Sequence, residues 1–554
     1  KSMRDGDGLR PAETLMVRLQ DAGVSLPAER LRSLMAGIVA APVPPADPEG
    51  WMRLIVPDAP PPDVKTALRA YREWASSAGE GGLTAGKTAT AARIAALRAR
   101  LTGAGLSAFI VPRADAHQGE YVPPHAQRLA WLTAFTGSAG MAVVLHDRAA
   151  LFVDGRYTLQ AAGEVDTTIF TVIETGTQRP GDWLAEVLPS QGRVGYDPWL
   201  HTPEGLASLR KGAARAGGTL VPLTANPVDA VWPDQPAPPV APVTPHDRCY
   251  AGEDSAAKRL RTGDCLDRDG AGAAVVTLPD SLAWLLNIRG GDIPHTPVAL
   301  SFGIVHRDGR VDWFLDGRKL TAEARAALDD SVRVCDPESF PAHLDALADS
   351  EGRVLADPAT APAWVLDRLE AAGASLCRAA DPIQALKACK NATELDGTRA
   401  AHERDGVAVA RFLAWLDETA EVRARAGHPV TEQEAAEVLE QYRAQDPLFR
   451  DSSFDTIAGA GAHGAIVHYR VTPETDRPLQ SGDLFLCDSG GQYPDGTTDI
   501  TRTVVAGTPS EAMRTAYTRV LQGHIALATA RFPEGTTGSQ LDAFARRPLW
   551  GAGM

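Results

Sequence analysis

The stretch that decides the fold is residues 454–505, which read FDTIAGAGAHGAIVHYRVTPETDRPLQSGDLFLCDSGGQYPDGTTDITRTVV. Within it, an apolar run ends in Asp488, a Pro-Asp-Gly turn follows at 494–496, and the residues after the turn favour strands. This pattern predicts a β-hairpin. With the Pro and Asp at the centre of the turn, Asp488 lies opposite Thr501, and Asp499 is a diagonal neighbour of Asp488 on the same face.

Two carboxylates on one face of a hairpin can bind a small cation. Like charges held close together raise one pKa or attract positive charge. Oxygen ligands on rigid strands suit hard divalent ions such as manganese, magnesium or cobalt. The alternative is that Asp488 and Asp499 are solvated side chains on an exposed strand, and their spacing alone favours this alternative. The residues around the pair change that balance.

Two segments of this stretch resemble one family. Residues 488–503, DSGGQYPDGTTDITRT, are similar to the metal-binding hairpin of the Xaa-Pro aminopeptidases (aminopeptidase P), which are pita-bread metallopeptidases. Residues 464–469, GAIVHY, resemble the segment whose histidine meets the substrate in that family. The resemblance implies a metal-dependent aminopeptidase that removes the amino-terminal residue from peptides with proline in second position.

The resemblance also implies roles for five side chains. Asp488 and Asp499 would hold metal, in a site for two divalent ions that we expect to be manganese, with cobalt or zinc as alternatives. His468 would stabilise the oxyanion at the scissile carbonyl, unless it is a strand histidine satisfied by a neighbour, and Phe454 would line the substrate pocket. Arg156 would approach the peptide from the other subunit of a homodimer; the alternative is a surface arginine paired with the nearby aspartate.

Segments further upstream resemble the other domains of the same family. Three segments between residues 115 and 157, including a DGRY motif, resemble the amino-terminal creatinase-like domain, and SLAWLLNIRGGDIPHTP at 281–297 also resembles aminopeptidase P. Three-domain members of the family carry a duplicated non-catalytic module. We therefore predict domains at the following residues: a creatinase-like domain at 89–245, a second one at 246–385, and the pita-bread catalytic domain at 386–554.

The predicted fold class is α/β multidomain, with two creatinase-like α/β modules followed by an incomplete pita-bread α+β domain and preceded by a helical, proline-rich segment at 1–88. The family holds its two metals with two aspartates, one histidine and two glutamates. The histidines and glutamates that the chain offers after Asp499 are Glu511, His524 and Glu534, and none stands in the family's context for a ligand. We therefore expect a carboxy-terminally truncated chain that is catalytically inactive or nearly so.

Other functions stay open at this point. A prolidase or creatinase shares the catalytic fold, although the duplicated module favours the longer aminopeptidase P. A non-catalytic peptide-binding or scaffold protein, built on an inactive pita-bread domain, is the alternative from another class.

Composition narrows the possible partners. Among 554 residues, 55 Lys and Arg stand against 70 Asp and Glu, for a formal charge of −15. An acidic chain without basic runs argues against nucleic acid or an anionic membrane as the main partner, and no run approaches the length of a membrane span. Six scattered cysteines without a CxxC pair fit reduced thiols. We therefore expect a cytoplasmic protein, and the resemblance implies that its partners are peptides.

Three smaller signals receive structural interpretations. Residues 81–88, GGLTAGKT, fit the phosphate-binding pattern GxxxxGK[ST], but a charged helical stretch precedes them where a P-loop needs a buried strand. A flexible glycine-rich linker is the preferred interpretation. His117 is expected to stabilise a turn, and His295 is expected to be a structural loop histidine, because no second ligand type lies at metal spacing from it.

Overall fold

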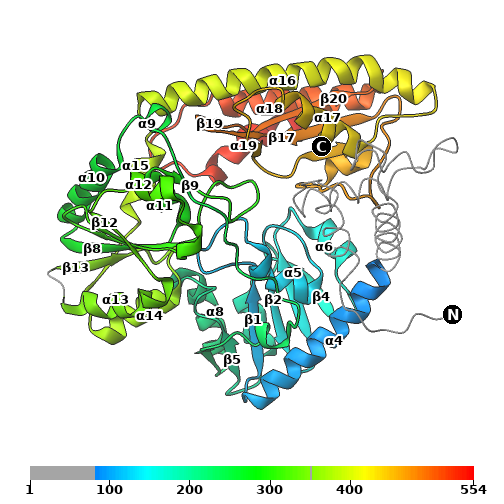
Figure 1. Ribbon diagram of the computed structural model, residues 1–554. Coiled ribbons are helices and arrows are strands. Elements are labelled where there is room, and N and C mark those ends of the chain that lie inside the picture. Colours follow the sequence, from blue (N-terminus) through cyan, green and yellow to red (C-terminus); the bar gives the residue numbers. More distant parts are fainter. Residues whose placement is uncertain (1–81, 350–351) are drawn as a thin grey trace, which may run out of the picture. The chain divides into compact units, whose positions relative to one another are not determined.

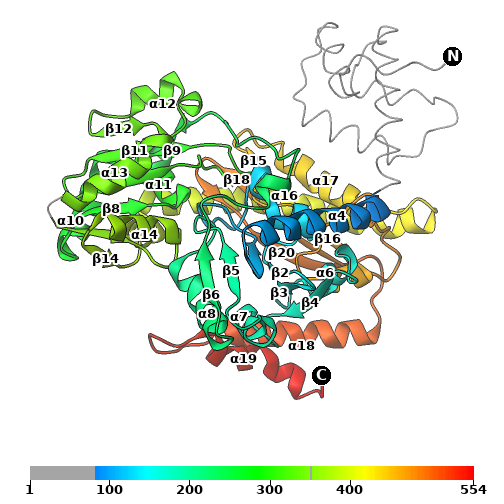
Figure 2. The same ribbon diagram turned by 90° about the horizontal axis from the view of Figure 1, so that it is seen from below.

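The computed structural model describes residues 82–349 and 352–554, and Figures 1 and 2 show them in two views. They divide into two compact units. The first unit takes in the described residues up to 113 and residues 127–197 and 208–235; the second takes in 114–126, 198–207 and 236–554.

The first unit is built on a six-stranded sheet in the order β4-β3-β2-β1-β5-β6. β1, β2 and β3 pair antiparallel at its centre, whereas the pairs β3–β4, β1–β5 and β5–β6 are parallel. The strands are β1 (Ala108–Pro112), β2 (Met141–Leu145), β3 (Ala149–Val153), β4 (Phe170–Glu174), β5 (Arg193–Tyr196) and β6 (Thr219–Pro222). The helices of this part of the chain are α4 (Gly82–Gly103), α5 (Arg128–Thr133), α6 (Thr158–Glu164), α7 (Pro180–Val187) and α8 (Pro203–Arg215).

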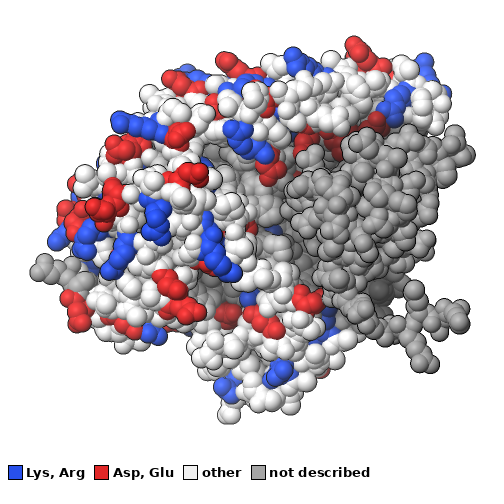
Figure 3. Space-filling view, viewed as in Figure 1, with Lys and Arg blue, Asp and Glu red and all other residues white. Residues whose placement is uncertain are grey.

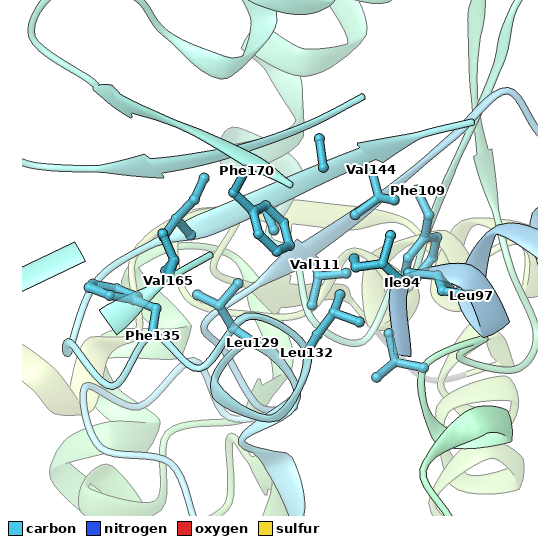
Figure 4. Close-up of a cluster of buried hydrophobic side chains, with 14 of the residues drawn as sticks. Ile94, Leu97, Phe109, Val111, Leu129, Leu132, Phe135, Val144, Val165 and Phe170 are labelled. Atoms are coloured by element: carbon cyan, nitrogen blue, oxygen red, sulfur yellow. The ribbon is translucent and has the colours of Figure 1, made fainter. Parts of the chain in front are cut away.

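A hydrophobic core joins this sheet to its helices (Figure 4). Every residue of β1 and of β3 is buried, as expected for central strands that are covered on both faces. Apolar side chains from α4, α5 and the strands point toward one another in this core, among them Ile94, Leu97, Phe109, Leu132 and Val144. Burial of this apolar surface is what stabilises the unit.

The second unit begins with a sheet of the same topology. Its order is β12-β11-β10-β8-β13-β14, and each strand pair has the same direction as its counterpart in the first sheet. The strands are β8 (Ala271–Val276), β10 (Phe302–His306), β11 (Val311–Phe314), β12 (Val332–Cys335), β13 (Arg353–Ala356) and β14 (Leu376–Arg378). The helices are α9 (Arg248–Ala251), α10 (Ser255–Arg268), α11 (Pro279–Leu286), α12 (Ala322–Ala327), α13 (Phe340–Ala346), α14 (Ala363–Ala372) and α15 (Pro382–Ala388), and β7 (Thr244–Pro245) pairs with β9 (Ile288–Arg289). The predicted duplication of the creatinase-like module is confirmed by this repeated strand order.

The rest of the second unit is a smaller α+β region. The antiparallel sheet β16-β17-β20 has one face covered by two helices, α16 (Ala392–Arg425) and α17 (Glu432–Arg443), and a second sheet has the order β15-β18-β19. The strands are β15 (Asp451–Ser452), β16 (Ile457–Ala460), β17 (Leu484–Ser489), β18 (Gly491–Tyr493), β19 (Gly496–Thr497) and β20 (Ile500–Val505). Two further helices, α18 (Glu511–Ala528) and α19 (Gly538–Trp550), pack side by side, and Figure 2 shows the pair.

The buried face of α16 differs from the one expected from its apolar pattern. The sequence predicts that Val407, Ala410, Leu413, Ala414 and Leu416 point inward. Of these, Leu416 is buried and Leu413 is half-buried, whereas Val407, Ala410 and Ala414 are exposed. The buried stripe instead runs through Ala401, Asp405, Ala408, Val409, Phe412, Leu416 and Ala420. Asp405 belongs to this stripe because it forms a buried ion pair with Arg443 of α17.

Two further expectations concern the amino-terminal part. The predicted helical segment at 1–88 lies outside the described residues, apart from 82–88. Those seven residues form the first turns of α4. The expectation of a flexible linker there is wrong, because the helix already begins at Gly82.

The surface carries mixed charge. On the face shown in Figure 3, Lys and Arg side chains are interspersed with Asp and Glu over the described residues. On this face the described residues form no large patch of one sign of charge. Among the helices of the described part of the chain, none has the length and apolarity needed to cross a membrane.

Candidate active site

The predicted hairpin is present and has the predicted register. β17 pairs antiparallel with β20, and Asp488 lies opposite Thr501. β18 and β19 continue the hairpin to the turn. Along β17, Phe485 and Cys487 are buried whereas Asp488 is only partly buried, because alternate residues of a strand point to opposite faces. Cys487 packs on the helix-covered face, so Asp488 stands on the other face.

The carboxyl groups of Asp488 and Asp499 interact on that face. The pKa of Asp499 is raised, first by burial and then by the charge of Asp488 and a hydrogen bond with its carboxyl group. Thr501 Oγ1 donates a hydrogen bond to Asp488 Oδ1 at 2.6 Å. Two carboxyl groups that repel one another and share a proton would be stabilised by a cation in place of that proton. The pair therefore fits one hard divalent ion.

The fit is partial for a site with two ions. In residues 82–349 and 352–554 there is no group of three or more His, Cys, Asp or Glu side chains arranged to hold a metal. The described residues thus offer two oxygen ligands from one hairpin. Two carboxylates can hold a hydrated ion weakly, but they do not form a rigid cage for two ions.

A buried polar network holds the hairpin in place. Asp405 of α16 accepts hydrogen bonds from Arg443 of α17 at 2.6 and 3.1 Å and from the hydroxyl of Tyr493 at 3.0 Å. Arg443 also donates to Ser489 Oγ at 3.1 Å. The Asp405 and Arg443 side chains are 0% and 1% exposed. Since Ser489 adjoins Asp488, this network connects both helices to the strand that presents the carboxylates.

The loop that carries His468 starts on the face of the sheet β16-β17-β20 that carries Asp488. Ile457 of β16 lies opposite Asp488, and a 3-10 helix, η7 (Gly461–Ala465), follows β16. A Cβ on Gly464 would lie 3.5 Å from Leu486 Cβ, whose side chain alternates onto the face of Asp488. His468 follows η7, is exposed, and has a backbone φ of 56°. The structure therefore brings the start of the predicted substrate-binding loop next to the strand of the carboxylate pair.

Three domain-family models match this chain. The model of the creatinase/prolidase N-terminal domain matches residues 93–231, a second model of that description matches 234–394, and the metallopeptidase family M24 model matches 396–554. Aminopeptidase P2 of Arabidopsis thaliana is 39% identical over 484 residues, which are 82% of this chain and 68% of that protein. A probable Xaa-Pro aminopeptidase P of Laccaria bicolor is 38% identical over 504 residues, 89% of this chain and 76% of that protein. The chain belongs to the Xaa-Pro aminopeptidase P family of M24 metallopeptidases.

A solved structure from this family of enzymes has the same fold. The X-prolyl aminopeptidase of Caenorhabditis elegans, described as a cytosolic enzyme with a di-nuclear active site, matches with a TM-score of 0.78 and 32% identity. The match covers 84% of this chain and 78% of the C. elegans chain. This agreement confirms the predicted creatinase-like and pita-bread architecture.

Sequence reasoning missed a buried carboxylate beside the His468 loop. Glu432 is completely buried and accepts hydrogen bonds from the Ala460 and Arg477 backbone amides, at 2.6 and 3.1 Å, and from the Tyr469 hydroxyl at 3.1 Å. Nδ1 of His463 lies 2.9 Å from Glu432 Oε1. Burial and Glu432 raise the pKa of Tyr469 to about 12. Only the T-x-x-E capping pattern at 431–434 indicated a helix start here, and it did not single out Glu432.

Arg156 lies in the first unit. Its guanidinium donates to the Asp154 carboxylate at 2.9 and 2.7 Å, and it also lies over the ring of Tyr157 at 5.1 Å. This ion pair is the alternative that the sequence left open, although it does not prevent a contact with peptide. The role of Arg156 in a second subunit therefore stays a prediction.

Proposed function

We propose that this chain carries the peptide-binding face and part of the metal site of an aminopeptidase that removes the amino-terminal residue from peptides with proline in second position. The observation that carries the proposal is the carboxyl pair of Asp488, on β17, and Asp499, directly before β20, which interact with each other. Membership of the family, with relatives named for this activity, supports the substrate class.

Asp488 and Asp499 would hold divalent metal in this proposal. When bound, two such ions, manganese with cobalt or zinc as alternatives, would lower the pKa of a water toward neutral pH. Carboxylate oxygens are suitable ligands for hard ions. The description of the C. elegans relative as having a di-nuclear active site supports the number of ions.

The remaining predicted residues would bind the peptide. His468 would donate a hydrogen bond to the scissile carbonyl oxygen as negative charge develops there. Phe454 precedes β16 by three residues and is half-buried, so part of its ring is open to a ligand; it would contact the substrate side chains. Arg156 would reach the peptide from the second subunit of a homodimer. The six cysteines are all free, which supports the proposed cytoplasmic location.

The ligand count predicts that this 554-residue chain binds metal weakly and cleaves little or no peptide. Two carboxylates leave most of the coordination sphere of an ion to water. The same number of metal ligands favours a second candidate function, a peptide-binding protein without catalysis. This protein would bind the same peptides as the aminopeptidase but would not cleave them.

The test combines binding and cleavage of short peptides in the presence of Mn²⁺. Calorimetric titration of the chain with Ala-Pro-Ala, Ala-Ala-Ala and the dipeptide Ala-Pro should show preferential binding of Ala-Pro-Ala. Incubation with Ala-Pro-Ala should release no detectable free alanine. Preference for Ala-Pro would favour a prolidase, and no preference among the three would contradict the proposed specificity. Metal-dependent release of alanine would support the aminopeptidase activity and contradict the prediction of inactivity.

A further inference from the structure

His295 joins the second creatinase-like module to the segment around Phe454. Its Nδ1 lies 3.1 Å from Asp451 Oδ2 and 3.1 Å from the Ser452 carbonyl oxygen, and its Nε2 lies 3.3 Å from Asp455 Oδ1. The His295 side chain is 20% exposed. These contacts hold both sides of Phe454, because Asp451 and Asp455 flank it in the sequence.

The partners of the imidazole favour its positively charged form. Both ring nitrogens face oxygen atoms, and they can donate to these oxygens together only when both nitrogens carry a proton. Asp451 raises the pKa of His295 through a hydrogen bond, while partial burial and Arg470 act in the opposite direction. The charged groups that face the ring are therefore two carboxylates, Asp451 and Asp455, and one arginine, Arg470.

The same cluster reaches the His468 loop and the metal hairpin. Arg470, two residues after His468, forms an ion pair with Asp455. The backbone carbonyl of His295 accepts a hydrogen bond from Gln492 Nε2 at 2.8 Å, and Gln492 lies on β18 opposite Asp451. One residue of the second module thus contacts, directly or through Asp455, the segments that carry Phe454, His468 and the tip of the hairpin.

The backbone of His295 is held in an uncommon conformation. Its φ is 63°, in the left-handed region that few non-glycine residues adopt, although Asn, Asp and His do so more often than the others. The flanking residues Ile293 and Thr296 form a β-bridge that closes this turn. A strained residue persists when its surroundings determine it, and such residues cluster at functional sites.

We propose that His295 is a positioning residue, through which the second module orders the Phe454 segment and the His468 loop for peptide binding. This role rests on the proposed function, in which both segments contact the substrate. It also gives the non-catalytic module a part in the site. Removal of the His295 imidazole would release Asp451, which precedes Phe454, and Asp455, which follows it.

The first experiment measures order without using activity. Hydrogen exchange of residues 451–455 and 464–470 is compared in the full chain and in His295→Asn, a substitution that tolerates the left-handed backbone. We expect exchange in both segments to be faster by about threefold or more in the variant. His306→Asn is the matched control, because His306 Nε2 lies 3.1 Å from Asp312 Oδ2 and is also 20% exposed, yet contacts only its own module.

The pH dependence separates the imidazolium from simple packing. A group whose folded pKa is raised stabilises the fold below its unfolded pKa and loses that effect as pH rises through the folded value. The difference in exchange between the chain and His295→Asn should therefore be largest below about pH 6.5 and shrink at higher pH. A difference that is constant with pH, or equal exchange in the two proteins at all pH values, would overturn the proposal.

A double-mutant cycle and peptide titration complete the test. On an Asp451→Asn background, His295→Asn should add little to the exchange rate, because the pair has already been broken; additive effects would contradict the assignment. Affinity for Ala-Pro-Ala should fall by about tenfold in His295→Asn and stay unchanged in His306→Asn; equal affinity in all three proteins would contradict the proposal. If the unmodified chain binds no peptide, the proposed function fails, and the exchange data still decide whether His295 orders these segments.

Discussion

Buried charged side chains fix positions that an apolar pattern cannot predict. Asp405 lies in the buried stripe of α16 and forms an ion pair with Arg443 of α17, with both side chains almost completely inaccessible. The apolar pattern of a helix places aspartates on the solvent side. It therefore predicts that Val407 points inward, but this residue is 51% exposed in the structure.

Removal of one partner of this pair should be costly. Asp405→Asn leaves Arg443 as a buried charge without its carboxylate partner, so we expect the free energy of unfolding to fall by about 3 kcal/mol. Urea denaturation followed by circular dichroism measures it. Asp396→Asn on the same helix is the control, because its carboxylate is 76% exposed, and it should change the free energy by less than about 0.5 kcal/mol. Equal effects of the two substitutions would contradict the role of the pair.

The register of the two candidate metal ligands could be predicted, because it depends on local rules. The Pro-Asp-Gly turn and strict alternation place Asp488 opposite Thr501 once the turn centre is chosen. The contacts of Glu432 and His295 could not be predicted in this way. Their partners are 28 or more residues away in the sequence, and no turn or spacing rule connects them.

At the scale of the element, the close packing of α18 on α19 depends on a glycine. A Cβ on Gly523 would lie 2.1 Å from the Ala545 carbonyl oxygen, so a side chain there must push the two helices apart. By contrast, a Cβ on Gly406 of α16 would have no atom within 4 Å. Ser510 caps α18 by accepting a hydrogen bond from the Met513 amide, as serine commonly does at the start of a helix.

Alanine substitutions at these two glycines should have opposite effects. Gly523→Ala should destabilise the helix pair by about 1–3 kcal/mol, through overpacking against a backbone atom. Gly406→Ala should stabilise α16 by about 0.5–1 kcal/mol, because alanine has the higher helix propensity. Hydrogen exchange of the amides in α18 and α16 reports each change locally. Slower exchange of α18 in Gly523→Ala would contradict the claim that the close approach of α18 to α19 requires a glycine at residue 523.

At the scale of the whole molecule, two sheets of one topology precede the hairpin region. Both sheets have a central antiparallel trio with parallel strands outside. The duplication could be predicted through the resemblance, because three-domain members of the family carry a second creatinase-like module. The pairing of β15 with β18 could not, since β15 has only two residues and carries no periodic signal.

Acid should destabilise the second unit through a buried histidine. His201 is 4% exposed, and burial lowers its pKa to about 4. The unfolded chain therefore binds more protons than the folded chain between about pH 4 and pH 6.5, and stability is lost as pH falls through that range. We expect a loss of about 2 kcal/mol at pH 5 from this group.

Urea denaturation at pH 7 and pH 5 measures the effect. The pH dependence should become smaller in His201→Gln, whatever the absolute stability of that variant. His402→Gln, which replaces an exposed histidine of α16, should keep the dependence of the unmodified chain. An unchanged dependence in His201→Gln would assign the acid sensitivity to other groups.

The central claim is that Asp488 and Asp499 together bind a divalent cation. Titration of the chain with Mn²⁺, followed by the loss of the electron paramagnetic resonance signal of free Mn²⁺, tests it most directly. The account predicts weak binding, with a Kd on the order of 0.1–1 mM, that is lost in Asp488→Asn and in Asp499→Asn and kept in Asp396→Asn. Binding that persists unchanged in both hairpin variants would contradict the claim.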